Sequence, residues 1–299
     1  TAYVSEKLKQ VQLDLDEQKL KPYFPLENVK AGVFDIAERL YGLRFKKNTA
    51  IEGYHPEVDI YEVFNRKGDF YALLYTDFFP RPGKRNGAWM TSYRGQKKGQ
   101  RPHISMVCNF SKPTANTPSL LTFQEVTTLF HEFGHALHGM LANTTYGGLS
   151  GTNVFWDFVE LPSQIMENWC YEKEALKLFA KHYKTGELLP MEYIDKIKKV
   201  AHFQQGLQTL RQLGFGFLDL SYHGKDATKI EDVKTHESQI LERVQFLKNY
   251  PESCNSTAFS HIFQGGYSAG YYSYKWAEVL DADAFELFLE KGIFDPETA

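Results

Sequence analysis

Residues 121–138 read Leu-Thr-Phe-Gln-Glu-Val-Thr-Thr-Leu-Phe-His-Glu-Phe-Gly-His-Ala-Leu-His, and they carry the strongest structural signal in the chain. The first ten residues, Leu121–Phe130, supply an apolar stripe that leads into the histidines. Apolar residues that recur with helical spacing form one buried face of a helix. The pattern therefore predicts a helix over residues 123–141 with one face in the core.

The motif His131-Glu132-Phe-Gly-His135 lies within this helix. Two histidines four residues apart are one turn apart on the same face, so their imidazoles can converge on one tetrahedral metal ion. Glu132 lies between them and is placed to act as a general base. His138 is about 10 Å along the helix axis from His131, which excludes it as a third ligand; we assign it a structural or supporting role. The alternative is an ordinary amphipathic helix whose histidines form structural hydrogen bonds and bind no metal.

A catalytic zinc needs three protein ligands and one open position. The stretch Asp157-Phe-Val-Glu160-Leu-Pro-Ser-Gln lies about 25 residues past the motif, beyond a glycine-rich turn that suits an antiparallel helix hairpin. Glu160 is the preferred third ligand, and Asp157 and Glu167 are alternatives that would otherwise orient a histidine, with Ser163 in the same supporting group. Pro162 would kink the helix and aim Glu160 at the metal. The competing interpretation is that these acidic residues form a solvent-exposed face of the helix and bind no metal.

The rest of the chain is predicted to be mainly helical with a small β-sheet, in one domain over residues 1–299. The first 120 residues combine helices with a sheet of three or four strands, and residues 121–299 are helical. The expected strands cover 58–63, 70–75 and 103–108, and the expected helices cover 28–42, 123–141, 154–181, 191–221, 229–249 and 271–290.

Composition excludes several classes of protein. The 299 residues are 42% hydrophobic, which is enough for a buried core, and 34 Lys and Arg against 37 Asp and Glu leave no basic footprint for nucleic acid. The sequence contains no run of about 18 uncharged apolar residues, so it predicts no membrane span. Cys108, Cys170 and Cys254 are too few and too scattered for a disulfide framework or a cysteine zinc site.

Residues 131–138, taken with Gly151-Thr-Asn-Val-Phe-Trp-Asp-Phe-Val-Glu-Leu-Pro-Ser-Gln-Ile-Met-Glu-Asn-Trp169, resemble the thimet oligopeptidase family of zinc peptidases. The resemblance runs from residues 41–43 to residues 261–276. It implies a zincin-like, neurolysin-like catalytic domain holding one Zn²⁺, with Glu160 as third ligand and Glu132 as general base. It also implies that the family's N-terminal lobe and its last helices lie outside this sequence.

A second segment, His261-Ile-Phe-Gln-Gly-Gly-Tyr-Ser-Ala-Gly-Tyr-Tyr-Ser-Tyr-Lys-Trp276, is a glycine loop that leads into a tyrosine-rich helix. Tyr267, Tyr271 and Tyr274 follow helical spacing, so their hydroxyls can line one wall, although an aromatic core stripe has the same spacing. Phenols and an imidazole also suit stabilisation of an oxyanion. The resemblance places oxyanion and substrate-binding roles on His261, Tyr267 and Tyr274, and Tyr271 shares their wall.

The residues of the stretches 77–94 and 158–164 resemble the peptidyl-dipeptidase branch of that family more than its other branches. Release of C-terminal dipeptides needs a cation to hold the free carboxylate, and Arg94, Lys84 and Arg85 are the candidates. Residues Gly87, Ala88, Trp89 and Met90 are expected to form an edge strand that pairs with the substrate backbone.

The sequence therefore predicts zinc-dependent hydrolysis of short peptides, with release of C-terminal dipeptides. Alternatives are an internally cleaving oligopeptidase, a zinc-binding fragment that is inactive without the missing lobe, a helical binding module with an inert motif, and an aminopeptidase. No acidic anchor for a substrate amine supports the last of these. The resemblance implies a cytoplasmic location, or a periplasmic one if a signal peptide preceded this sequence.

Overall fold

The computed structural model describes residues 2–246, 250 and 252–299. Helices dominate, and the strands fall between residues 44 and 107. In chain order the elements are α1 (Ala2–Leu13), α2 (Glu17–Leu20), α3 (Leu26–Tyr41), β1 (Arg44–Lys47), β2 (Asp59–Phe64), β3 (Phe70–Asp77), β4 (Trp89–Arg94), β5 (His103–Val107), α4 (Phe123–Leu141), α5 (Trp156–Val159), α6 (Leu161–Glu167), α7 (Lys173–Phe179), α8 (Met191–Ala201), α9 (Gln205–His223), α10 (Val233–Leu241), α11 (Ser260–Phe263) and α12 (Ser273–Lys291).

The described strands form one five-stranded sheet in the order β1-β2-β3-β5-β4. The β3–β5 pair is parallel, and the other neighbours are antiparallel. The sequence prediction of three or four strands omitted β1, whose residues Arg-Phe-Lys-Lys are mostly exposed at one edge. Lysine-rich edge strands bury little apolar surface and give a weak pattern. The opposite edge is β4, so the expected edge strand exists, although it begins at Trp89 rather than Gly87.

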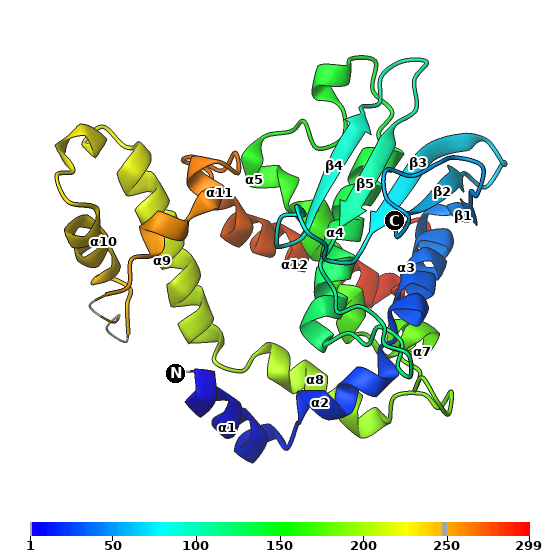
Figure 1. Cartoon of the computed structure of the whole chain (residues 1–299), viewed down its shortest axis with the longest axis horizontal. Helices are drawn as coiled ribbons and strands as arrows, with labels where there is room; N and C mark the ends of the chain where they lie inside the picture. The colour runs from blue at the N-terminus through cyan, green and yellow to red at the C-terminus, as the bar shows by residue number, and fades with distance from the viewer. Residues whose placement is uncertain (1, 247–249, 251) are drawn as a thin grey trace.

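Helix α4 is the centre of the fold, and its bounds match the predicted helix. A capping box fixes its start: the Thr122 hydroxyl accepts from the Glu125 amide, and the Glu125 carboxylate accepts from the Thr122 amide. The helix packs against β3, β4 and β5 on one side and against α6 on another. Figure 1 shows α4 behind the sheet, with α3 beside it.

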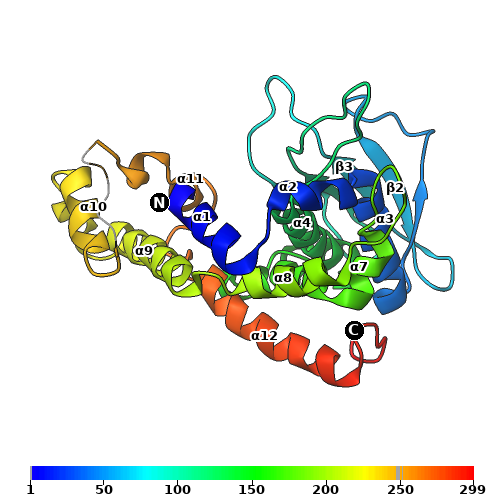
Figure 2. The same cartoon turned by 90° about the horizontal axis from the view of Figure 1, so that it is seen from below.

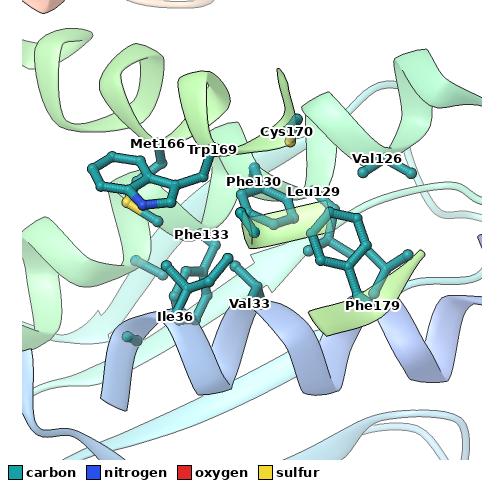
Figure 3. Packing of buried hydrophobic residues seen from close by; sticks show 14 of the residues in the cluster. Val33, Ile36, Val126, Leu129, Phe130, Phe133, Met166, Trp169, Cys170 and Phe179 are labelled. Carbon is teal, nitrogen blue, oxygen red and sulfur yellow. The ribbon is translucent and has the colours of Figure 1, made fainter. Parts of the chain in front are cut away.

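The main hydrophobic core fills the space around α4. In Figure 3, Phe130 and Phe133 of α4 lie between Val33 and Ile36 of α3 on one side and Trp169 on the other. All five side chains are fully buried. Burial of side chains of this size stabilises a fold by roughly 2–3 kcal/mol each. The helix that carries the histidine motif is therefore held rigidly by its apolar face.

Three of the predicted helices are shorter or broken. The run 154–181 divides into α5, α6 and α7, and Glu160 lies at the α5–α6 junction, with Pro162 in the first turn of α6. Pro162 has no amide hydrogen for a helix that continues from α5, which explains the break. The run 191–221 divides at Gln204, whose φ is 54°. The run 229–249 contains only α10, and its residues 247–249 lie outside the described part of the chain.

Helices α9, α10 and α11 form a small lobe that stands apart from the sheet in Figures 1 and 2. This lobe has its own core of Leu218, Leu241, Phe259 and Ile262. The chain returns from α11 to the body through residues 264–272 and then enters α12, which packs on α5 and α6. The tyrosine segment, residues 264–274, therefore lies where the small lobe meets the body. Among the described residues, no helix is both long and apolar enough to cross a membrane.

Candidate metal centre

His131, His135 and Glu160 converge at one point of the structure. Glu160 Oε2 lies 3.3 Å from His131 Nε2 and 3.2 Å from His135 Nε2. One ligand atom from each of the three residues falls within 4.8 Å of the others. Two ligands bound about 2.0–2.1 Å from a tetrahedral ion lie roughly 3.3–3.4 Å apart. The donor set of two imidazoles and a carboxylate, with this spacing, fits zinc.

A close approach between two helices brings Glu160 to the histidines. A Cβ on Gly134, inside the motif, would lie 2.1 Å from the carbonyl oxygen of Pro162 and 2.6 Å from the Cα of Ser163. Only glycine allows α4 and α6 to touch in this way. Glu160 precedes this contact by two residues, and its side chain is almost fully buried.

Two polar side chains support the ligands. His131 Nδ1 lies 2.6 Å from Glu167 Oε1, which leaves Nε2 facing the other donors. Ser163 Oγ donates within 2.9 Å of Glu160 Oε2 and is fully buried. Asp157 makes no hydrogen bond to the ligands within the described residues. His138 packs its ring beside Phe158, and its buried Nδ1 has no partner in the described part of the chain.

The charges of the site are mutually dependent. Burial alone would lower the pKa of His131, but hydrogen bonds to Glu160 and Glu167 raise it well above its usual value. Burial alone would raise the pKa of Glu160, but hydrogen bonds from the two histidines lower it strongly. Without a metal, His131 thus forms ion pairs with Glu160 and Glu167. A metal must displace a proton from His131, so its affinity falls at low pH.

Glu132 lies beside the three donors but is not joined to them. Its side chain is only 6% exposed, and its Oε2 has no hydrogen-bond partner within the described residues. Burial raises the pKa of this carboxyl group. A buried carboxylate with an unsatisfied oxygen is costly in an ordinary core, because polar groups there are normally hydrogen-bonded. Its position next to the donor set suits proton transfer at that point.

The tyrosine segment closes another side of the centre. The Tyr267 hydroxyl donates to Glu160 Oε1. The Tyr274 ring stacks on Tyr267, with 5.1 Å between the ring centroids. Burial raises the pKa of Tyr267, Tyr271 and Tyr274, that of Tyr271 to about 12, so these three remain protonated donors at neutral pH. His261 is exposed, with its ring 6.2 Å from Tyr267 and 6.0 Å from Tyr271.

The residues expected to bind the substrate's backbone and carboxylate lie around β4. Gly87 and Ala88 precede this edge strand, Trp89 is its first residue, and Arg94 is its last. The Arg94 guanidinium donates to the Arg101 carbonyl oxygen at 2.9 Å.

Two further cations were candidate carboxylate anchors. The Lys84 ammonium is buried against Asp77 Oδ1 at 2.9 Å and also donates to backbone carbonyls, so the expectation that it anchors a substrate carboxylate is wrong. The Arg85 guanidinium is exposed, 5.1 Å from the Trp89 ring.

Sequence reasoning missed three residues that shape this centre or hold the tyrosine segment beside it. In the sequence, Gly134 is one of the two residues of the motif His131-Glu132-Phe-Gly-His135 that received no role. Trp156 packs its indole 4.6 Å from the Tyr267 ring. Asp219, fully buried on α9, accepts hydrogen bonds from the amides of Ala269 and Tyr271. A lone acidic residue in the apolar run Leu218-Asp-Leu220 is the only sequence signal for Asp219.

Comparisons with known proteins agree with this geometry. The model of "Peptidase family M3" matches residues 1–299. Oligopeptidase A of Salmonella typhimurium is 43% identical over 99% of this chain and 45% of its own length. The organellar oligopeptidase A of Arabidopsis thaliana is 42% identical over 99% of this chain and 39% of its own. Dipeptidyl carboxypeptidase of Escherichia coli is 40% identical over 97% of this chain and 44% of its own.

The chain therefore spans less than half the length of these relatives. Relatives named oligopeptidase A and relatives named dipeptidyl carboxypeptidase match it to a similar degree, so the comparisons leave the mode of cleavage open. The family match over the whole chain and the His-His-Glu donor set lead to the same conclusion. The chain belongs to peptidase family M3, a family of zinc metallopeptidases.

Proposed function

We propose that this chain carries the catalytic centre for zinc-dependent hydrolysis of short peptides, in a zincin-like arrangement with one zinc per chain. His131, His135 and Glu160 would hold the ion. When bound, zinc supplies Lewis-acid polarisation of a carbonyl and acidifies water. The observation that carries the proposal is the tetrahedral spacing of these donors beside Glu132, whose buried Oε2 has no hydrogen-bond partner among the described residues.

Glu132 is the proposed general base. Its Oε2, which has no partner in the part of the chain that the structure describes, can accept a proton from the attacking water and later deliver that proton to the leaving amine. Burial raises its pKa above the ordinary value of a glutamate, which makes it a better proton acceptor than an exposed glutamate. The carboxylate of Glu160 differs, because its low pKa keeps it ionised as a ligand.

Tyr267 and Tyr274 are the proposed donors to the oxyanion, with His261 as a third contributor. Hydrogen-bond donors held beside the metal centre stabilise charge that develops in the transition state. Tyr267 must exchange its bond to Glu160 Oε1 for one to the oxyanion, because a phenol has only one hydrogen to donate. Tyr271 packs on Tyr274, with 5.0 Å between the ring centroids, and extends the same wall. Asp157 and His138 are proposed only as outer supports, since neither is hydrogen-bonded to the ligands within the described residues.

The proposed mode of cleavage depends on the cations around β4. Dipeptide release requires a free cation for the substrate carboxylate. The Lys84 ammonium is paired with Asp77, and the Arg94 guanidinium donates to a backbone carbonyl oxygen. Arg85 is therefore the remaining candidate for binding the substrate carboxylate. We propose C-terminal dipeptide release with Arg85 as anchor, and internal cleavage as the second candidate, favoured by the contacts that Lys84 and Arg94 already make within the chain.

The test compares wild type with Glu132→Gln, Glu160→Ala and, as a control, Glu286→Gln at an exposed site on α12. Glu132→Gln should keep about one zinc per chain and lose activity by roughly 100-fold or more. Glu160→Ala should lose the metal, and the control should match wild type. A Glu132→Gln variant that cleaves at full rate would refute the proposed base.

The substrates decide the mode. An N-acetylated peptide stops an aminopeptidase but not the other modes. A C-terminal amide slows dipeptide release strongly and leaves internal cleavage intact. Mass spectrometry of the products reads each mode directly. Zinc without cleavage of any peptide would support the alternative of a zinc-binding fragment that needs the part of its relatives' length that this chain does not span.

A further inference from the structure

Asp219 is a fully buried carboxylate outside the metal centre. It lies on α9 in the small lobe and has an exposed fraction of 0%. Its two oxygens accept from backbone amides of the tyrosine segment: Oδ1 from Ala269 N at 2.8 Å and Oδ2 from Tyr271 N at 2.8 Å. His223 Nδ1 lies 2.8 Å from Oδ1 as well. No Lys or Arg is paired with it among the described residues.

The amides that Asp219 binds belong to an unusual piece of backbone. Ala269 has a φ of 55°, which is the left-handed region that residues with a Cβ rarely adopt. Strained backbone of this kind persists only when its surroundings hold it in place. Here the bonds to Asp219 flank Gly270, so one carboxylate holds the chain on both sides of the turn.

The turn controls where the tyrosines point. Tyr267 lies two residues before Ala269, Tyr271 donates its own amide to Asp219, and Tyr274 follows in the first turn of α12. On the other side of the segment, the Trp156 indole packs on the Tyr267 ring. A Cβ on Gly266 would lie 3.3 Å from the same indole. The segment is thus held between the carboxylate of α9 and the indole of α5.

We propose that Asp219 is a positioning residue for peptide hydrolysis: it fixes the turn so that the hydroxyls of Tyr267 and Tyr274 face the metal centre. This inference rests on the proposed function for its kinetic consequence. Its structural consequence, the ordering of residues 264–274 by Asp219, stands independently. A displacement of about 1 Å in a catalytic donor is enough to lower a rate by roughly 100-fold.

The chain offers a matched control in Glu237. This carboxylate lies in the same lobe, is 3% exposed, and accepts from the amides of Asn255 and Ser256. It performs the same kind of bonding for a segment that carries none of the three tyrosines. A general weakening of the lobe should therefore follow from either variant, whereas loss of tyrosine placement should follow only from the Asp219 variant.

The experiment compares Asp219→Asn with Glu237→Gln in the whole zinc-loaded chain. Asparagine keeps one acceptor oxygen and turns an amino group toward the other backbone amide, so one of the two bonds is lost. We expect Asp219→Asn to keep its zinc, to lower kcat by roughly tenfold to 100-fold with a smaller change in KM, and to speed hydrogen exchange in residues 264–273 at least about tenfold. Glu237→Gln should leave kcat and that exchange unchanged.

Hydrogen exchange of wild type adds a test that needs no variant. The amides of Ala269 and Tyr271 should exchange more slowly than that of Ser268, in a segment whose Ala269 is exposed. Unprotected amides in wild type, or an Asp219→Asn variant with wild-type exchange and kcat, would overturn the inference. If wild type cleaves no peptide, the proposed function fails, and the exchange data still decide the role of Asp219.

Discussion

Replacing Gly134 with alanine tests whether the approach of α4 to α6 builds the metal centre. The added Cβ would lie 2.1 Å from the Pro162 carbonyl oxygen, whereas ordinary contacts begin at 3.4 Å. The shortfall is 3.4 − 2.1 = 1.3 Å. The obstructing atoms are backbone, including the Ser163 Cα at 2.6 Å, so no side-chain rotation relieves the clash. One helix must move away from the other.

Two opposing energies decide the effect of Gly134→Ala on stability. Alanine in a helix interior is favoured over glycine by about 1 kcal/mol. Overpacking typically costs about 1–3 kcal/mol, and a backbone clash belongs at the upper end. The expected net loss is therefore about 2 kcal/mol in the free energy of unfolding.

The same displacement separates the zinc ligands. Glu160 lies two residues before Pro162, and its Oε2 is now 3.2 Å from His135 Nε2. Metal–ligand distances tolerate only about 0.2 Å of error. A shift of α6 by most of the 1.3 Å shortfall exceeds that tolerance several-fold. We expect zinc affinity to fall by roughly 100-fold, with activity lost in parallel.

The assay is zinc stoichiometry by elemental analysis, combined with urea unfolding, for Gly134→Ala and for Gly216→Ala. Gly216 lies inside α9, and a Cβ there would meet no atom within 4 Å. The control should gain up to about 1 kcal/mol from helix propensity and keep its zinc. A Gly134→Ala variant that binds zinc like wild type and gains stability like the control would refute the close-approach argument.

Two further predictions concern buried charges away from the ligands. Burial raises the pKa of Asp281 to about 6, so the folded chain binds an extra proton, and stability falls as pH rises from about 4 to about 6. Asp281→Asn should then stabilise the chain at pH 7.5 by about 1 kcal/mol after allowance for solvent screening, and the gain should vanish below about pH 4 in urea unfolding. Burial opposes ionisation of Asp77, but hydrogen bonds from Arg81 and Lys84 lower its pKa to about 2. The ionised Asp77 therefore stabilises the fold above pH 3.8, the pKa of this group in the unfolded chain, and this contribution is lost as the pH falls through about 2. Lys84→Met should cost about 3 kcal/mol at pH 7 and move acid unfolding to higher pH; an unchanged acid transition would contradict this role.

Local sequence patterns predicted the central helix and the candidates within it. The bounds 123–141 of α4 are confirmed, because its cap, its apolar stripe and its histidine spacing all follow from the geometry of a single helix. The strands at β2, β3 and β5 are confirmed for the same reason, since alternation and turn residues are local signals. The charged edge strand β1 was missed because it buries little.

Breaks in long helical runs were harder to predict. Pro162 marked one of them, and the structure places Glu160 at that junction. Gln204 marked the other only through its left-handed backbone, which no residue type at that position signals.

The sequence by itself determined that one rigid helix presents two imidazoles and a glutamate at fixed spacing, since helix geometry alone sets those positions. Only the tertiary structure decided what meets them. The absence of a side chain on Gly134 matters because Pro162 lies against it. Asp219 becomes informative only when Ala269 and Tyr271 fold onto it. Lys84 changes from a candidate substrate anchor to a buried partner of Asp77. These contacts join segments distant in sequence or depend on burial, and no local periodicity encodes such packing.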